Sequence, residues 1–274
     1  MASIWLQSAT RPKFPALREN LHTDVLIIGG GIAGLLCAYR LQQAGVDYVL
    51  AEANTICSGI TKNTTAKLTA QHGLIYHKLL QKFGEEKAKL YLEANQAALE
   101  DYRLLCRDID CDFCPQDNYI YALDGTQKLE QELSALQKLG ARAEFCRNLP
   151  LPIPTAGAVK FPDQAQFHPL KFLSAIANGL RIYEHTPIRL LAPGLAKTDR
   201  VVISAEKIIV ATHFPILNTH GSYFLKMFQH RSYCLALESV PIPDGMSAKR
   251  AILSQPQWGP DPWWRWSPHR QARR

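Results

Sequence analysis

Residues 24–52, DVLIIGGGIAGLLCAYRLQQAGVDYVLAE, decide the fold class of this chain. Two short apolar runs, at 25–28 and 48–51, are typical of buried parallel strands. The segment 32–44 between them has the composition of a helix, which Gly45 ends. A strand, a glycine turn, a helix and a second strand predict a βαβ unit, and with it an α/β fold (α+β overall) built on a parallel sheet.

The turn carries the G-x-G-x-x-G spacing of a dinucleotide-binding motif. Its six residues are Gly29, Gly30, Gly31, Ile32, Ala33 and Gly34. The first glycine permits a tight turn, the second lets the backbone approach a pyrophosphate, and the third lets the helix pack close to the strand. The helix N-terminus offers free N–H groups and a partial positive charge to phosphates. The pattern predicts dinucleotide binding; a tight βαβ turn without a ligand is the alternative.

An acidic residue at the end of the second strand narrows the choice of dinucleotide. Glu52, followed by Ala53, lies 18 residues after Gly34 and can accept hydrogen bonds from ribose hydroxyls. A carboxylate there disfavours a phosphorylated ribose, so NADP is not expected, whereas NAD and FAD remain. The loop at 58–67 is rich in hydroxyl groups and favours FAD, because it could reach the pyrophosphate and the flavin ring. A solvated surface loop is the alternative interpretation of 58–67.

Segments along most of the chain resemble one family of enzymes. They are SIWLQSATRPKFPAL at 3–17, SGITKNTTAKLTAQHGLIY at 58–76, EANQAALEDY at 93–102, FPDQAQFHPLKFL at 161–173, RIYEHTPI at 181–188 and KIIVATHFP at 207–215. Over about residues 3–246 the chain resembles the FAD-dependent oxidoreductases of the D-amino-acid oxidase and glycine oxidase class. It resembles in particular the branch that usually carries a Rieske iron–sulfur domain at its C-terminus.

The resemblance implies FAD as the cofactor and a set of residues that hold it. The ADP half of FAD would lie on the glycine motif and Glu52, and the pyrophosphate and flavin would lie beside 58–67. The adenine would lie near Ile188, and the end of a late strand would border the cofactor. The further site residues implied in this way are Ser58, Gly59, Thr65, Ala66, Lys67, Ile188, Ala211 and Thr212. His213 stands where the broader class often has glycine. The Rieske-bearing branch tolerates this histidine.

The resemblance also implies the chemistry. A small-molecule amine or amino acid would be oxidised by hydride transfer to the flavin. The electrons would pass to oxygen or, in a full-length form, to the Rieske domain. No catalytic acid or base is assigned from the sequence. His72 and Tyr233 are candidates by position, although a packed or surface role is the simpler interpretation of each.

The resemblance and the periodicity divide the chain into two interleaved domains. We expect a Rossmann-like FAD-binding domain from 1–98 and 155–222, and part of a mixed-sheet substrate domain from 99–154 and 223–246. A helix is expected at 77–109, with strands at 113–123 and 141–146 around a helix at 126–139. We expect the core-facing side of the long helix to carry Leu79, Phe83, Leu90, Ala94, Ala97 and Leu105. Residues 201–205 and 207–211 are expected as two strands, the second one buried.

The tail at 247–274 departs from this pattern. It holds four of the five tryptophans, together with prolines and arginines, and has no helical or strand period. Shifted by one base, the codons of Trp263, Trp264 and Trp266 would encode glycines, as expected for a glycine turn. We therefore expect the tail to be a frameshifted reading of a longer gene, which leaves the chain truncated at its C-terminus. A truncated, non-catalytic remnant is the alternative to an enzyme, and an NAD-dependent dehydrogenase is a third interpretation.

Composition excludes several other classes. The chain has 274 residues, 47% of them hydrophobic, and a net charge of +7. Six basic residues against one acid give the tail +5, so the rest of the chain carries only +2, which argues against nucleic-acid binding. No signal peptide or membrane span is recognisable, and we expect a cytoplasmic protein. The sequence does not determine the substrate, the electron acceptor or the oligomeric state.

The seven cysteines suit a reducing compartment, because they are odd in number and scattered. Cys106, Cys111 and Cys114 have the spacing of a plant-type iron–sulfur site. Cys106 lies in a helical pattern, however, and no glycine-rich loop surrounds the three residues. We therefore expect buried or unreactive thiols and no metal site.

Overall fold

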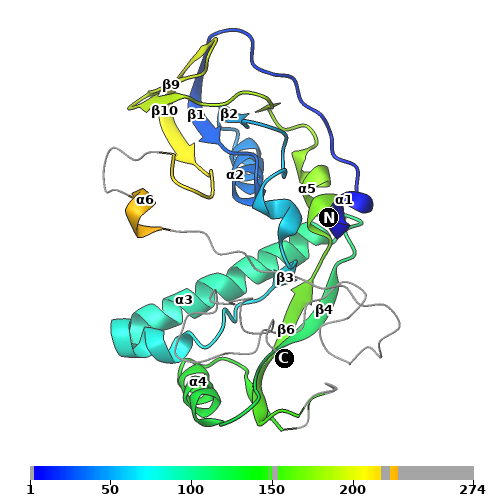
Figure 1. The fold of residues 1–274 in the computed structure, drawn as a ribbon, viewed down its shortest axis with the longest axis vertical. Coiled ribbons are helices and arrows are strands. Elements are labelled where there is room, and N and C mark those ends of the chain that lie inside the picture. The colour runs from blue at the N-terminus through cyan, green and yellow to red at the C-terminus, as the bar shows by residue number, and fades with distance from the viewer. Residues whose placement is uncertain (1–2, 148, 150–153, 217–222, 228–274) are drawn as a thin grey trace, which may run out of the picture. The chain divides into compact units, whose positions relative to one another are not determined.

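The computed structural model describes residues 3–147, 149, 154–216 and 223–227. These residues form two compact units that alternate along the chain (Figure 1). The first unit comprises residues 3–64, 109–111 and 168–227, and the second comprises 65–108 and 112–167. The candidate Tyr233 and the 247–274 tail lie outside the described residues.

The first unit is built on a six-stranded sheet in the order β7-β2-β1-β10-β9-β8. Four strands are parallel: β1 (Leu21–Ile28), β2 (Tyr48–Ala51), β7 (Ile182–Tyr183) and β10 (Val202–Val210). The antiparallel hairpin of β8 (Leu190–Ala192) and β9 (Leu195–Lys197) extends the sheet beyond β10. The shorter helical elements of this unit are α1 (Ile4–Gln7), η1 (Ile60–Asn63) and α6 (Tyr223–Lys226).

The predicted βαβ unit is confirmed almost residue for residue. Helix α2 (Ile32–Gln43) packs against β1 and β2, and α5 (Pro169–Ala177) packs against α2. Leu26 and Ile27 on β1 are both fully buried, as a strand covered on both faces requires. The helix ends at Gln43, and Gly45, just beyond its C-cap Ala44, adopts a left-handed φ of 68°. This is the arrangement of a Rossmann-like unit.

Strand β10 differs from its prediction. The two strands expected at 201–205 and 207–211 are one continuous strand, and its second half is not buried. Val210 is 40% exposed, and Glu206 and Lys207 are exposed. Strand β9 stops pairing with β10 at Ser204, so among the described strands the rest of β10 is paired only with β1.

The second unit is an antiparallel sheet covered by two helices. Strands β3 (Lys67–Leu68), β4 (Cys114–Ala122) and β5 (Glu144–Cys146) all pair antiparallel with β6 (Gly157–Gln166). Helices α3 (Tyr76–Cys106) and α4 (Gln127–Lys138) contact each other, and α4 also contacts β4, β5 and β6. Leu92, Leu129, Leu136 and Val159 are central residues of the shared core.

The border between the units differs from the one expected. All of α3 belongs to the second unit, although the FAD-binding domain was expected to continue to residue 98. Strand β6 also belongs to the second unit, whereas the described residues 223–227 belong to the first. The pairing of β3 with β6 joins the chain after Thr64 to the second sheet. Such a pairing between distant segments leaves no local periodicity in the sequence.

The face that α3 buries was also predicted wrongly. Ala88, Leu92, Leu99 and Cys106 are its buried residues beyond the first turns. Of the expected set, Leu90 is 58% exposed, Phe83 is 49% exposed, and Ala94 and Ala97 are exposed. Gly84 accounts for the change of face after it, because its φ of 80° and ψ of 174° interrupt the helix; Phe83 lies before this interruption. The helical phase that starts at Leu79 therefore does not continue past Gly84.

His168 connects α5 with the N-terminal segment inside the first unit. Its Nδ1 atom accepts the N–H of Lys171 at 3.2 Å and so caps the helix. The proton of the neutral ring is therefore on Nε2, which donates to the Ser8 hydroxyl at 2.9 Å. The side chain is fully buried. Burial, and then the charge of Lys171, lower the pKa of His168.

Replacing Gly34 by alanine should destabilise the first unit. The added Cβ atom would lie 1.9 Å from the carbonyl oxygen of Gly29, which is a backbone atom and cannot rotate away. We expect a loss of about 3 kcal/mol or more in the free energy of unfolding, measured by urea denaturation of the full chain. Gly59→Ala is the matched control, because no atom of the described residues, other than those of its neighbours in the chain, lies within 4 Å of its added Cβ. Equal losses in the two variants would contradict the close-packing argument.

Mild acid should destabilise the fold through His168. Because the pKa of His168 is lowered in the folded chain, the unfolded chain is protonated first as the pH falls below about 6.5, which favours unfolding. We expect Tm to fall between about pH 6.5 and pH 5 by roughly 2–4 °C more in the wild type than in His168→Asn. The asparagine amide oxygen can still cap α5 but does not titrate. If Tm falls with pH equally in the wild type and in His168→Asn, the titration of His168 does not destabilise the fold.

Candidate cofactor-binding site

The glycine turn lies at the carboxyl end of β1, where three backbone segments meet. Gly29 has a φ of 112°, and a Cβ atom added there would lie 2.5 Å from the carbonyl oxygen of Ala211. Gly34 faces Gly29 across the turn, where no side chain fits. Both glycines are therefore required by the fold itself. In open α/β sheets this carboxyl edge is where ligands bind.

The start of α2 offers free hydrogen-bond donors at this edge. The N–H groups of Gly31 and Ala33 have no hydrogen-bond partner within the described part of the chain. Gly31 is half-buried and Ala33 is exposed, so both can be reached from outside. Among the described residues, and apart from the neighbours of Gly31 in the chain, only the Thr61 hydroxyl oxygen comes within 4 Å of a Cβ added at Gly31, at 3.3 Å. Free donors, a helix N-terminus and an open backbone suit a diphosphate.

Glu52 follows β2 and is tied to the same turn. Its Oε2 atom accepts the N–H of Gly30 at 2.6 Å, and its Oε1 atom accepts the N–H of Asn54 at 2.8 Å. The carboxylate is half-buried. A carboxylate offers about four acceptor positions, so two remain for the hydroxyls of a ribose. Glu52 thus has the acceptor positions that the predicted ribose contact needs. It also fixes the glycine turn, a role that the sequence did not suggest.

Two of the other predicted residues border the glycine turn directly. Ala211 donates its N–H to the carbonyl of Ile28 at 2.8 Å, and its own carbonyl faces Gly29. The backbone nitrogen of Thr212 would lie 3.2 Å from a Cβ added at Gly29. Ile188, by contrast, packs against the core cluster that contains Ile28 and Val49.

The predicted loop at 58–67 is divided between the units. Ser58 and Gly59 belong to the first unit, whereas Thr65, Ala66 and Lys67 belong to the second. Ala66 is buried with a left-handed φ of 61° and accepts the N–H of Phe167. Burial lowers the pKa of Lys67. Ala53 and Gly59 are exposed, and nothing surrounds the Cβ position of Gly59.

Thr61 is a site residue that sequence reasoning did not single out within its loop. It is 8% exposed, and its hydroxyl oxygen accepts the N–H of Ile32, the first residue of α2, at 3.2 Å. The hydroxyl can still donate its own proton toward a group bound at the helix start. The threonines at 61, 64 and 65 look alike in the sequence, so only the fold distinguishes Thr61.

Glu184 and Arg11 were also missed, although both lie in quoted segments. Glu184 is 2% exposed and accepts the N–H of Ile56 at 2.7 Å. Arg11 donates to the carbonyl of the same residue at 2.7 Å. The neighbouring Cys57 is buried, and burial raises the pKa of its thiol to about 12. A thiol with this pKa stays protonated and unreactive near neutral pH.

The second unit places the candidate His72 in a polar cluster. Its Nδ1 atom lies 3.0 Å from the hydroxyl of Tyr91. Burial, and next the charge of Lys67, lower the pKa of His72, so the ring is neutral at pH 7. Glu132 is fully buried nearby in the same unit, but it accepts three N–H groups at the start of α3, from Ile75, Tyr76 and His77. That makes Glu132 a helix cap rather than a free acid.

Among the described residues, no group of three or more His, Cys, Asp or Glu side chains is placed to hold a metal ion. Cys106 and Cys111 are buried, and Cys114 is half-buried. The same residues include no helix that is both long and apolar enough to cross a membrane.

Comparison with known proteins identifies relatives over most of the chain. "Putative Rieske 2Fe-2S iron-sulfur protein YhfW" of Bacillus subtilis (strain 168) is 39% identical over 258 residues, which are 89% of this chain and 51% of that protein. Gamma-glutamylputrescine oxidoreductase of Escherichia coli (strain K12) is 26% identical over 231 residues, 77% of this chain and 54% of that protein. The chain thus spans about half the length of these curated relatives.

Solved structures show the same fold. Glycine oxidase from Geobacillus kaustophilus matches with a TM-score of 0.53 and 19% identity, over 70% of this chain and 56% of that one. L-amino acid deaminase from Proteus myxofaciens matches with a TM-score of 0.54 and 15% identity, over 75% of this chain and 48% of that one. The family model described as DAO, FAD dependent oxidoreductase, matches residues 24–260. This chain therefore belongs to the DAO family of FAD-dependent oxidoreductases.

Proposed function

We propose that the first unit binds FAD and that the chain acts in the oxidation of an amine or amino acid. The observation that carries the proposal is the open helix start beside the glycine turn. It presents the free N–H groups of Gly31 and Ala33 next to the carboxylate of Glu52. Donors for a diphosphate and an acceptor for a ribose thus lie together, as one end of FAD requires.

The residues that would hold FAD are those whose geometry is described above. Gly31, Ala33 and Thr61 would face the pyrophosphate, and Glu52 would face the ribose. Ala211 and Thr212 would border the cofactor, because they line the other side of Gly29. Ile188, Ser58, Gly59, Ala53 and residues 65–67 remain proposed contacts that rest on family resemblance.

The substrate class rests on the family and its relatives. When bound, FAD supplies a hydride acceptor for a carbon that carries an amine. Glycine, L-amino acids and gamma-glutamylputrescine appear in the relatives' names, and each carries an amine nitrogen. The ammonium form of the substrate must lose a proton before hydride transfer, because only the neutral amine has a free lone pair. A neutral His72 beside Tyr91 would not oppose this loss. We assign no catalytic residue.

The electron acceptor is proposed from one relative. The Bacillus subtilis protein is named for a Rieske 2Fe-2S centre, and this chain covers 51% of its length. In a longer form, electrons would pass from the reduced flavin to such a centre; otherwise oxygen would take them. We place the described chain in the cytoplasm, and we propose no nucleic-acid or membrane partner.

The first experiment is to purify the chain and identify its bound cofactor. We expect the protein to carry FAD, released on denaturation and identified by chromatography, and the flavin to be bleached by an amine or amino acid under anaerobic conditions. Bound FAD without bleaching by any amine would support a non-catalytic remnant. Binding of NADH without flavin would instead favour a dehydrogenase and contradict the proposal.

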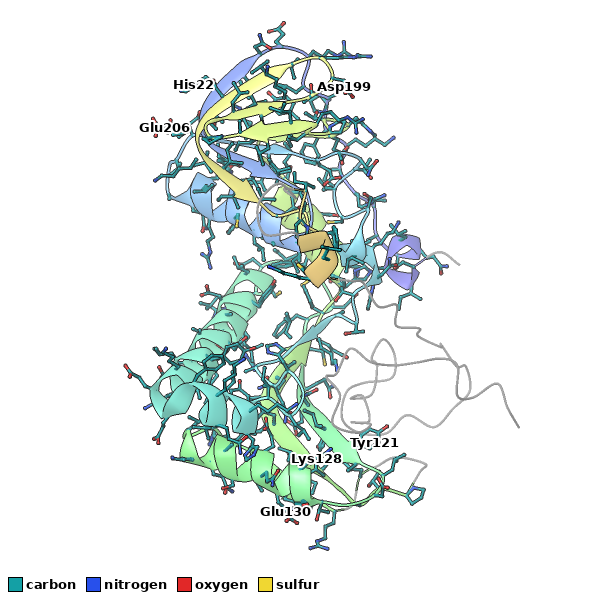
Figure 2. The ribbon with its side chains drawn as sticks, turned by 60° about the vertical axis from the view of Figure 1, so that its left-hand side comes forward. His22, Tyr121, Lys128, Glu130, Asp199 and Glu206 are labelled. Carbon is teal, nitrogen blue, oxygen red and sulfur yellow. The ribbon has the colours of Figure 1, made fainter. Side chains whose placement is uncertain are left out.

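Glu52→Gln should weaken FAD binding. The neutral amide keeps one acceptor oxygen, but it loses the charge-assisted bonds to Gly30 and to the ribose. We expect the Kd for FAD, measured by quenching of flavin fluorescence on reconstitution, to rise by about tenfold. Glu206→Gln is the matched control. Figure 2 shows Glu206 near His22 on the sheet of the first unit, and Glu206 is exposed. An unchanged Kd in Glu52→Gln would contradict the assigned ribose contact.

A further inference from the structure

The segment 55–57 separates the N-terminal segment of the chain from the glycine turn. On one side, Cys57 donates its N–H to the carbonyl of Gly30 at 2.8 Å. The Cγ2 atom of Ile56 would lie 3.0 Å from a Cβ added at Gly30. The N–H of Gly30 is bound by Glu52. The peptide groups on both sides of Gly30 are therefore fixed, one by Glu52 and the other by Cys57.

On its other side, the same segment is held by two charged residues. Glu184 accepts the N–H of Ile56 at 2.7 Å, and Arg11 donates to the carbonyl of Ile56 at 2.7 Å and to the hydroxyl of Thr55 at 3.3 Å. Ile56 is thus fixed at both its N–H and its C=O group. A buried carboxylate is costly unless donors surround it. Glu184 meets this need with Ile56 and with the N–H of Phe14 at 3.1 Å.

The backbone of Cys57 shows that this hold is needed. Its φ of 56° lies in the left-handed region, which is unfavourable for a residue with a side chain. Such a conformation persists only where surrounding bonds fix it. The bonds that fix it come from Gly30 on one side and, through Ile56, from Arg11 and Glu184 on the other.

We propose that Arg11 and Glu184 are positioning residues of the FAD site. They hold the Ile56–Cys57 peptide against Gly30, and thereby keep the glycine turn open for the diphosphate. The assignment rests on the proposed function. It gives the N-terminal segment at 3–17 a role in cofactor binding, although the glycine motif lies later in the chain.

Arg11→Ala in the full chain tests the proposal, because removing Arg11 leaves no buried charge without donors. Two quantities are measured: the Kd for FAD, and amide hydrogen exchange at Gly30 and Cys57 in the apoprotein. We expect the Kd to rise by about tenfold and exchange at both amides to accelerate by a similar factor, with exchange in β1 unchanged. Arg11→Lys should recover part of both losses. Arg18→Ala is the control, because Arg18 is exposed and directly follows this segment.

Three results would overturn the assignment. If the Kd for FAD and the amide exchange rates in Arg11→Ala equal those in Arg18→Ala, Arg11 does not fix the Ile56–Cys57 peptide. A higher Kd for FAD with unchanged amide exchange at Gly30 and Cys57 would indicate that Arg11 contacts the cofactor directly. Faster exchange throughout β1 would show general destabilisation. If the wild-type chain takes up no FAD, the proposed function fails, while exchange at Gly30 and Cys57 still decides whether Arg11 fixes the turn.

Discussion

The close approach of three backbone segments at Gly29 is the constraint on which the rest of the first unit depends. The end of β1, the start of α2 and the end of β10 come so near that a methyl group at Gly29 or Gly34 would overlap with backbone atoms. Because no side chain separates them, the N–H groups at the start of α2 stay accessible at the carboxyl edge of the sheet. The same packing that makes the βαβ unit compact therefore leaves accessible the N–H groups that the proposed FAD site would use.

Three glutamates perform a common task in the two units. Glu52, Glu132 and Glu184 each accept N–H groups from the backbone rather than pairing with a basic side chain in the bonds described. Each one joins segments that are distant in the sequence, such as Phe14 and Ile56 for Glu184. Burial raises the pKa of Glu132, which shows that its three N–H partners only partly offset the cost of removing the carboxylate from water. A buried carboxylate in this chain thus serves to join backbone segments.

Family membership and local geometry support the proposed function in different ways. The family model places the chain in a family of FAD-dependent oxidoreductases, and the geometry of the glycine turn supports the proposed position of one end of the cofactor. The substrate side of the proposal rests on the family, because the chain spans only about half the length of its curated relatives. The polar cluster of His72, Tyr91 and Lys67 in the second unit is the described region whose side chains suit a role in amine chemistry.

The sequence by itself determined the βαβ unit, the glycine motif and Glu52, because strand, turn and helix there depend on residues adjacent in the chain. It also indicated FAD, through resemblance in segments spread from residue 3 onward. Only the tertiary structure decided which face α3 buries, since Gly84 breaks the helical phase. It alone placed β6 in the second sheet and identified Thr61, Arg11 and Glu184 beside the turn. These depend on hydrogen bonds between segments far apart in the chain, which local periodicity does not record.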